Sequence, residues 1–318
     1  MTQDEENPGE KKRIPDSRLV AGASDAGLRL DAFLARRFGR SRKQLRENIE
    51  DAVLSASNQP LKWSHRMSCE EEIFIPRLQR PEPDVEVSYR ILYEDEYLVA
   101  VDKGPGAPVH PARAFRERTI LTHLQRDLDD PELRPAHRLD RETSGVLIFT
   151  RDRASTTALM TQFAKQTPKK RYLAVVHGRP DFDQMRLDLP LGADPDFPIK
   201  IRRCPSATGQ KAITDFEVIE RYPKVSLVAA EPWTGRQHQI RVHLASLGHP
   251  VIGDKLYLEE GRPYLDLIKN RLNPEDLARL GHSRQALHAE RLRLLHPADE
   301  REMEFVAPLP EDLRALLV

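Results

Sequence analysis

The stretch 137–149 reads HRLDRETSGVLIF and contains the side chains best suited to chemistry. Asp140 stands between Arg138 and Arg141 in a polar turn that ends in Thr-Ser-Gly. The apolar run after this turn is typical of a buried strand, so we expect Asp140 to lie at the mouth of a core strand. A turn carboxylate beside arginines is more often structural than catalytic, and this stretch alone favours a structural role.

A second stretch, 235–248, reads GRQHQIRVHLASLG and has helical spacing. Thr234 is placed to cap the start of this helix, and Gly248 to end it. Arg241 then lies in the apolar face, and a buried guanidinium requires an anionic partner, ideally a carboxylate that accepts two hydrogen bonds. We predict that Asp140 is this partner and that the pair lowers the pKa of the carboxylate. The alternative is that Arg241 reaches solvent or binds phosphate.

A third stretch, 169–178, reads KKRYLAVVHG and is typical of a strand entered from a basic turn. If Tyr172 points to the core side, its ring can line a pocket and stack on a flat base. A tyrosine in a strand is more often a plain core residue, so this stretch is weak by itself.

Apolar periodicity places these stretches in a domain of mixed strands and helices. A linker at 80–84, rich in proline and acidic residues, marks a boundary near residue 80. We therefore expect a disordered lead-in at 1–18, a small domain at 19–80 with two short helices and a last strand, and a larger domain at 81–318. Strands are predicted at 97–102, 145–150, 172–178 and 225–231, and helices at 120–128, 153–165, 236–247 and within the insertion 259–283.

Composition excludes several functional classes. The 318 residues carry no net charge, and no run approaches the roughly 20 apolar residues of a membrane span, so we expect a cytoplasmic protein without a membrane partner. Cys69 and Cys204 form no metal motif, and His238 and His243 are five apart, which disfavours a helical zinc pair. Basic residues concentrate at 137–179, which indicates either a face for a polyanion such as RNA or an ordinary solvated surface.

Taken in order, the segments HRLDRETSG, KKRYLAVVHG and GRQHQIRVHLASLGHPVIGDKLY resemble the three motifs of the RluA-type pseudouridine synthases. The resemblance extends over about 85–317, and the chain departs from it at 102–106, DKGPG, where the family more usually has Lys-Pro-Ala-Gly. Residues 28–76 resemble the S4 RNA-binding domain, with Ser-Asn-Gln at 57–59 in place of the usual Val-Asn-Gly turn. The resemblance implies an α+β pseudouridine synthase fold, with a mixed, mainly antiparallel central sheet flanked by helices and loops, plus a small N-terminal S4-like α/β module.

The resemblance also implies roles for individual residues. Asp140 would be the nucleophile, Arg241 its ion-pair partner, and Tyr172 the ring stacked on uracil and a candidate base for the C5 proton. Arg138 would fill the space left by the flipped uridine, and Ile240 would close the pocket. No metal or organic cofactor is implied. Further RNA contacts are predicted for His137, Arg141, Lys170, Arg236 and Gln239.

We therefore predict a monomeric enzyme that isomerises uridine in RNA, with large-subunit ribosomal RNA favoured and transfer RNA as the alternative substrate. A non-catalytic RNA-binding or ribosome-assembly factor would not need a buried ion pair. A hydrolase of nucleosidic bonds would normally need a second carboxylate to activate water, and the motifs offer no clear one.

Overall fold

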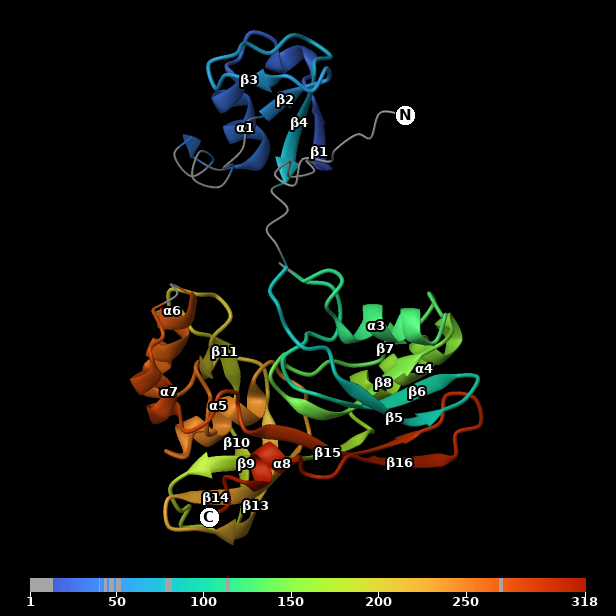
Figure 1. Cartoon of the computed structure of the whole chain (residues 1–318), viewed down its shortest axis with the longest axis vertical. Coiled ribbons are helices and arrows are strands. Elements are labelled where there is room, and N and C mark those ends of the chain that lie inside the picture. The colour runs from blue at the N-terminus through green and yellow to red at the C-terminus, as the bar shows by residue number, and fades with distance from the viewer. Residues whose placement is uncertain are drawn as a thin grey trace, which may run out of the picture. The chain divides into compact units, whose positions relative to one another are not determined.

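The computed structural model describes residues 14–39, 41, 42, 45, 49, 53–77, 82–112, 115–268 and 271–318. The chain forms two compact units, Met1–Glu82 and Pro83–Val318, which divide within the proline-rich linker sequence (Figure 1). Within the described residues, no helix is long and apolar enough to cross a membrane.

The N-terminal unit has a four-stranded sheet in the order β1-β4-β2-β3, and helix α1 (Leu30–Phe38) buries Phe33 and Leu34 in its core. The lead-in predicted for 1–18 extends too far, because 14–18 belong to strand β1, which pairs with β4. Of the two short helices predicted for the small domain, the second, expected after Ser41 at 42–53, lies mostly outside the described residues. The strands are β1 (Ile14–Val20), β2 (Val53–Ser55), β3 (Pro60–Leu61) and β4 (Glu72–Arg77), and a 3-10 turn covers Ala23–Asp25.

The second unit is built on a ten-stranded sheet, whose main path runs β10-β13-β14-β9-β15-β8-β6-β5, with β16 on β15 and β7 on β8. All of these pairings are antiparallel except β15 with β8, so the predicted mixed, mainly antiparallel sheet is confirmed. The strands are β5 (Tyr89–Glu94), β6 (Leu98–Lys103), β7 (Arg134–Pro135), β8 (Ser144–Thr150), β9 (Lys169–His177), β10 (Gln184–Asp188), β13 (Ile213–Arg221), β14 (Val225–Pro232), β15 (Leu287–Leu295) and β16 (Glu302–Val306). A separate pair is formed by β11 (Leu191–Ala193) and β12 (Arg203–Pro205).

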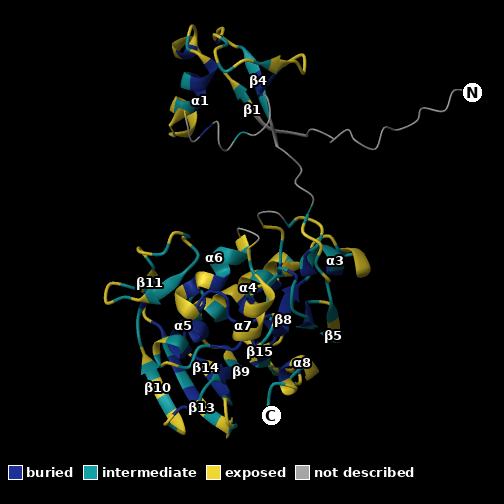
Figure 2. Ribbon diagram, turned by 60° about the vertical axis from the view of Figure 1, so that its left-hand side comes forward, coloured by how far each residue is buried: buried dark blue, intermediate teal, exposed yellow. Residues whose placement is uncertain are grey.

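Helices flank this sheet and cover its apolar residues, which lie mostly along the central strands (Figure 2). Every residue of β8 is buried, as the apolar run VLIF at 146–149 within it predicts. The helices predicted at 120–128 and 153–165 are α3 and α4, each capped by a side-chain oxygen. The helices are α3 (Ile120–Asp127), α4 (Arg153–Ala164), α5 (Gln239–Ser246), α6 (Arg262–Ile268), α7 (Pro274–Leu280) and α8 (Glu311–Arg314), with a 3-10 turn at Glu259–Gly261.

The helix predicted at 236–247 is shorter than expected, because α5 begins only at Gln239. His238 has φ 60°, a left-handed conformation that cannot continue a helix. Thr234 is not the cap: its hydroxyl donates to the Gln239 side chain, whose amide in turn donates to the Ile213 carbonyl. The residues before α5 are therefore an irregular loop tied to β13.

Gly145, the second residue of β8, makes the parallel pairing with β15 possible. It has φ 111°, and a Cβ built on it would lie 2.2 Å from the Ala289 carbonyl oxygen. Only glycine fits this approach without displacing backbone. The Gly145 that ends the first motif therefore fixes where the Asp140 turn meets the sheet.

Candidate active site

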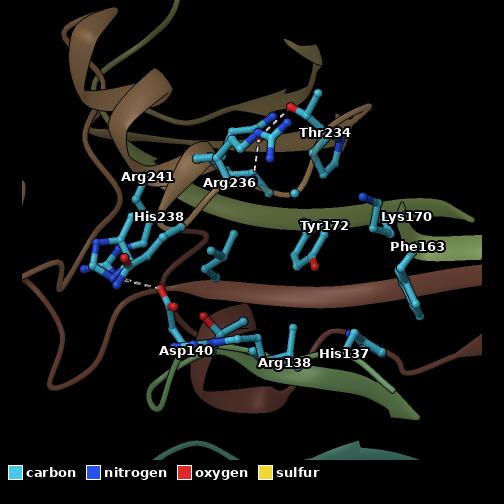
Figure 3. Close-up of a pocket in the computed structure, with 18 of the residues that line it drawn as sticks. His137, Arg138, Asp140, Phe163, Lys170, Tyr172, Thr234, Arg236, His238 and Arg241 are labelled. Atoms are coloured by element: carbon cyan, nitrogen blue, oxygen red, sulfur yellow. Dashed lines mark hydrogen bonds and ion pairs between the residues drawn. The ribbon is translucent and has the colours of Figure 1, made fainter. Parts of the chain in front are cut away.

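A cavity of about 420 Å³ brings the three motifs together in the second unit (Figure 3). Its walls come from the turn before β8, from β9, and from the loop that leads into α5. The lining residues are Ala136, His137, Arg138, Leu139, Asp140, Thr143, Phe163, Ala164, Gln166, Lys170, Tyr172, Pro232, Thr234, Gly235, Arg236, Gln237, His238, Gln239, Ile240, Arg241 and Leu287.

A buried lysine stabilises the turn that carries Asp140 by hydrogen bonds to its backbone. Lys103 is completely buried at the end of β6, and its Nζ donates to the carbonyls of Gly104, Arg141 and Thr143 at 2.8, 2.9 and 3.0 Å. Burial lowers the pKa of Lys103 to about 7. Three acceptors satisfy this desolvated amine and fix the backbone on the C-terminal side of Asp140.

Arg241 connects Asp140 to a second carboxylate. Its Nη1 donates to Asp140 Oδ2 at 2.7 Å, so the predicted contact is present. The two-bond carboxylate contact predicted for Asp140 is instead made by Asp254, which accepts from Nε at 2.6 Å and from Nη2 at 2.8 Å. Asp254 is fully buried, whereas the Asp140 side chain retains 25% exposure. Asp254 neutralises the guanidinium, and Asp140 keeps one face toward the cavity.

Arg241 also explains why Asp140 is ionised. Burial acts to raise the pKa of Asp140, but the charge that His238 carries when protonated, the charge of Arg241 and hydrogen bonds from Arg241 and Gln285 outweigh it and lower the pKa to about 2. Burial lowers the pKa of His238 to about 4, so this ring is neutral at pH 7. The permanent cation that keeps Asp140 ionised at neutral pH is therefore Arg241.

The cavity between β9 and the Asp140 turn is lined by an aromatic side chain, Tyr172, and by two cationic side chains, Lys170 and Arg138. Tyr172 lies between Asp140 and Lys170 in Figure 3, on the same face of β9 as Lys170. Burial and the charge of Asp140 raise the pKa of Tyr172, so its phenol is protonated at neutral pH. Burial lowers the pKa of Lys170 to about 8. Within the described residues, neither Lys170 nor the exposed Arg138 has a hydrogen-bond or ion-pair partner.

Four of the residues predicted to contact RNA also make contacts within the protein. His137 packs on Phe163 with ring centroids 4.8 Å apart and accepts from a backbone N–H, and burial lowers its pKa to about 3. This neutral ring offers no charge to a phosphate. The Gln239 amide is fully used within the protein, Arg236 Nε donates to the Lys211 carbonyl, and Arg141 lies outside the lining and pairs with Glu142.

Three residues at the site were not predicted from the sequence: Asp254, Tyr257 and Lys103. Asp254 follows Gly253 in the GDKLY end of the third motif, and a lone carboxylate in this apolar segment was the available signal. Tyr257 places its ring 5.1 Å from the Arg241 guanidinium, and Lys103 belongs to the DKGPG loop. Across the residues that the structure describes, no group of three or more metal-binding side chains is found.

The sheet, together with a carboxylate–arginine pair and a tyrosine in one cavity, agrees with the class of pseudouridine synthases. The family model described as RNA pseudouridylate synthase matches residues 97–246. The chain is 34% identical over 304 residues to ribosomal large subunit pseudouridine synthase D of Neisseria meningitidis serogroup A, with 92% of this chain and 78% of that protein covered.

It is also 38% identical over 221 residues to dual-specificity RNA pseudouridine synthase RluA of Escherichia coli K12, covering 69% of this chain and 92% of that protein. Among solved structures, human RNA pseudouridylate synthase domain containing 1 matches with a TM-score of 0.56 and 27% identity, over 70% of this chain and 83% of that one. The chain therefore belongs to the RluA-type family of RNA pseudouridine synthases, which are isomerases.

Proposed function

We propose that Asp140 is the catalytic carboxylate with which this protein converts uridine in RNA to pseudouridine. In this reaction the N1–C1′ bond breaks, a C5–C1′ bond forms, the proton at C5 leaves, and N1 gains a proton. The observation that carries the proposal is an ionised Asp140 at the wall of a cavity, held by Arg241 and faced by Tyr172. Such a carboxylate can add to the sugar or help remove a sugar proton. Neither step requires a metal or an organic cofactor.

The other lining residues have roles that follow from their surroundings. Tyr172 offers its ring for stacking on uracil. Because its pKa is raised, its phenol is protonated at neutral pH and is not a resting base for the C5 proton. Ile240, which is buried, closes the apolar side of the cavity. Arg138 is free to enter the space that a flipped uridine leaves, which offsets a few kcal/mol of unstacking.

Lys170 is the side chain we assign to an RNA phosphate. It is largely buried and has no partner among the described residues, so its charge is uncompensated without a ligand. Placing a phosphate next to this ammonium would supply the missing anion. An RNA chain bound at the cavity would supply such a phosphate.

We favour large-subunit ribosomal RNA as the substrate, with transfer RNA as the alternative. The support is the name of the Neisseria relative, which refers to the large ribosomal subunit, while the Escherichia coli relative is named as dual-specificity. We assign RNA binding to the unit Met1–Glu82, as an S4-like module. The cavity is lined by one chain, so a monomer suffices to form the site. A ribosomal RNA substrate would place the reaction in the cytoplasm.

The test is reverse-transcription mapping of carbodiimide-treated ribosomal and transfer RNA from a strain lacking the protein. A stop that is absent in this strain and returns with the wild type, but not with Asp140→Asn, would support the isomerase and identify its uridine. An unchanged map would contradict the proposal for these RNAs and favour a non-catalytic RNA-binding factor.

A further inference from the structure

His238 occupies a position at the site that the ion pair alone does not explain. It is the residue immediately before α5, and its side chain is 5% exposed. One ring nitrogen, Nδ1, lies 2.8 Å from the Tyr257 hydroxyl, and the other, Nε2, lies 3.8 Å from Asp140 Oδ2. The ring is therefore fixed on one side and faces the catalytic carboxylate on the other.

We propose that His238 is a positioning residue for Asp140, and that Tyr257 fixes the ring with its Nε2–H facing the carboxylate. This inference rests on the proposed function. It adds two residues, His238 and Tyr257, to the set that acts on the carboxylate during the reaction.

The hydrogen bonds around Tyr257 determine which nitrogen carries the proton. The backbone N–H of Arg203 donates to the Tyr257 oxygen at 3.0 Å, so the hydroxyl proton is available for His238 Nδ1. The opposite tautomer would leave the hydroxyl proton of this buried tyrosine without an acceptor among the described residues. Nδ1 is therefore the acceptor, and the neutral ring carries its proton on Nε2.

This Nε2–H gives Asp140 an additional uncharged donor beside the side chains of Arg241 and Gln285. At 3.8 Å it is too far for a hydrogen bond in this state, and a movement of about 1 Å would bring it into range. Arg241 makes a single hydrogen bond to Asp140 Oδ2, and Gln285 is a further side-chain donor toward this carboxylate. A donor that engages as the carboxylate reacts would limit its rotation.

The inference is tested with two variants of the full-length protein. His238→Asn tolerates the left-handed backbone and keeps a polar group near Tyr257, but it lacks the nitrogen that faces Asp140. Tyr257→Phe keeps the ring beneath Arg241 and loses the proton that fixes the tautomer. His123→Asn on α3, outside the cavity lining, is the matched control.

The assay is tritium release under single-turnover conditions from protein-free large-subunit ribosomal RNA. The RNA is labelled with [5-³H]uridine and taken from a strain lacking the protein. We expect the rate constant to fall roughly 10- to 100-fold in both site variants, with RNA affinity close to wild type. The melting temperature should fall by a few degrees at most, because each variant leaves buried hydrogen-bonding groups unpaired. The rate constant of the double variant should be little lower than that of His238→Asn alone, because both substitutions remove the same donor, the Nε2–H of His238.

A nitrogen-15 spectrum of the histidine-labelled protein checks the tautomer directly. Wild type should show His238 protonated on Nε2 and not on Nδ1, and Tyr257→Phe should shift protonation toward Nδ1. A wild-type rate in His238→Asn, or a proton on Nδ1 in the wild type, would overturn the inference. If the wild type itself releases no tritium, the proposed function fails, and the inference fails with it.

Discussion

Asp254 is the residue on which the charge balance of the site depends. It is fully buried and accepts two hydrogen bonds from Arg241 and two from the backbone N–H groups of Leu256 and Tyr257, so Asp254→Asn leaves a buried guanidinium with Asp140 as its remaining carboxylate. Breaking a buried pair in this way costs about 3–5 kcal/mol. We expect the free energy of unfolding, measured by urea denaturation, to fall by about this amount.

Asp181→Asn is the control for this change, since Asp181 is exposed and has no partner among the described residues. Its free energy of unfolding should stay within about 0.5 kcal/mol of wild type. If the two variants are equally stable, Asp254 does not neutralise Arg241 as the geometry indicates.

Lys170 should make RNA binding depend on pH on the alkaline side. Burial lowers its pKa to about 8, so the free protein carries this ammonium below pH 8 and loses it as the pH rises above 8. If the ammonium binds a phosphate, RNA affinity falls between pH 7 and pH 9, by roughly the ten-fold that one charge-assisted hydrogen bond contributes. Filter binding at constant ionic strength measures this effect.

Lys170→Arg is the matched variant, because a guanidinium stays charged throughout this pH range. Its RNA affinity should change less between pH 7 and pH 9 than that of wild type. The same pH dependence in both proteins would assign the effect to another group.

At the scale of elements, the parallel contact between β15 and β8 depends on Gly145. An alanine there would place its Cβ 2.2 Å from the Ala289 carbonyl oxygen, at a φ of 111°. We expect Gly145→Ala to cost about 3 kcal/mol or more, because backbone on both strands must shift. Thermal unfolding and tritium release should both be impaired, since this strand follows the Asp140 turn directly.

Gly248→Ala separates the steric clash from the conformational effect. Gly248 also has a positive φ, 81°, but a Cβ there meets no atom within 4 Å. The cost should be about 1 kcal/mol, with activity retained. Equal losses in the two variants would contradict a specific role for the β8–β15 approach.

Sequence periodicity predicted the elements that depend on local pattern, such as the fully buried β8 and the capped helices α3 and α4. It misplaced the start of α5, because the loop before this helix is ordered by Gln239 bonding to β13, a contact distant in sequence. The Asp140–Arg241 contact followed from the need to neutralise a buried arginine. Asp254 was missed because nothing local indicated that its turn would face the same guanidinium.

At the scale of the whole molecule, the two units have separate cores, and the cavity lies within Pro83–Val318. We therefore expect the isolated fragment 83–318 to fold and to convert RNA at saturating concentration with a rate constant within about three-fold of the full chain. Its affinity for RNA should be lower, with a smaller dependence on salt, if Met1–Glu82 makes the phosphate contacts that we assign to it. Unchanged affinity and salt dependence would contradict RNA binding by Met1–Glu82.

The most direct test of the central claim is tritium release from [5-³H]uridine-labelled ribosomal RNA by purified wild type and Asp140→Asn. The variant keeps the size of the side chain and leaves Arg241 paired with Asp254, so the fold and RNA affinity should be close to wild type. The account predicts release by the wild type and a loss of at least about 1,000-fold in the variant. A folded, RNA-binding Asp140→Asn protein that releases tritium at the wild-type rate would contradict it.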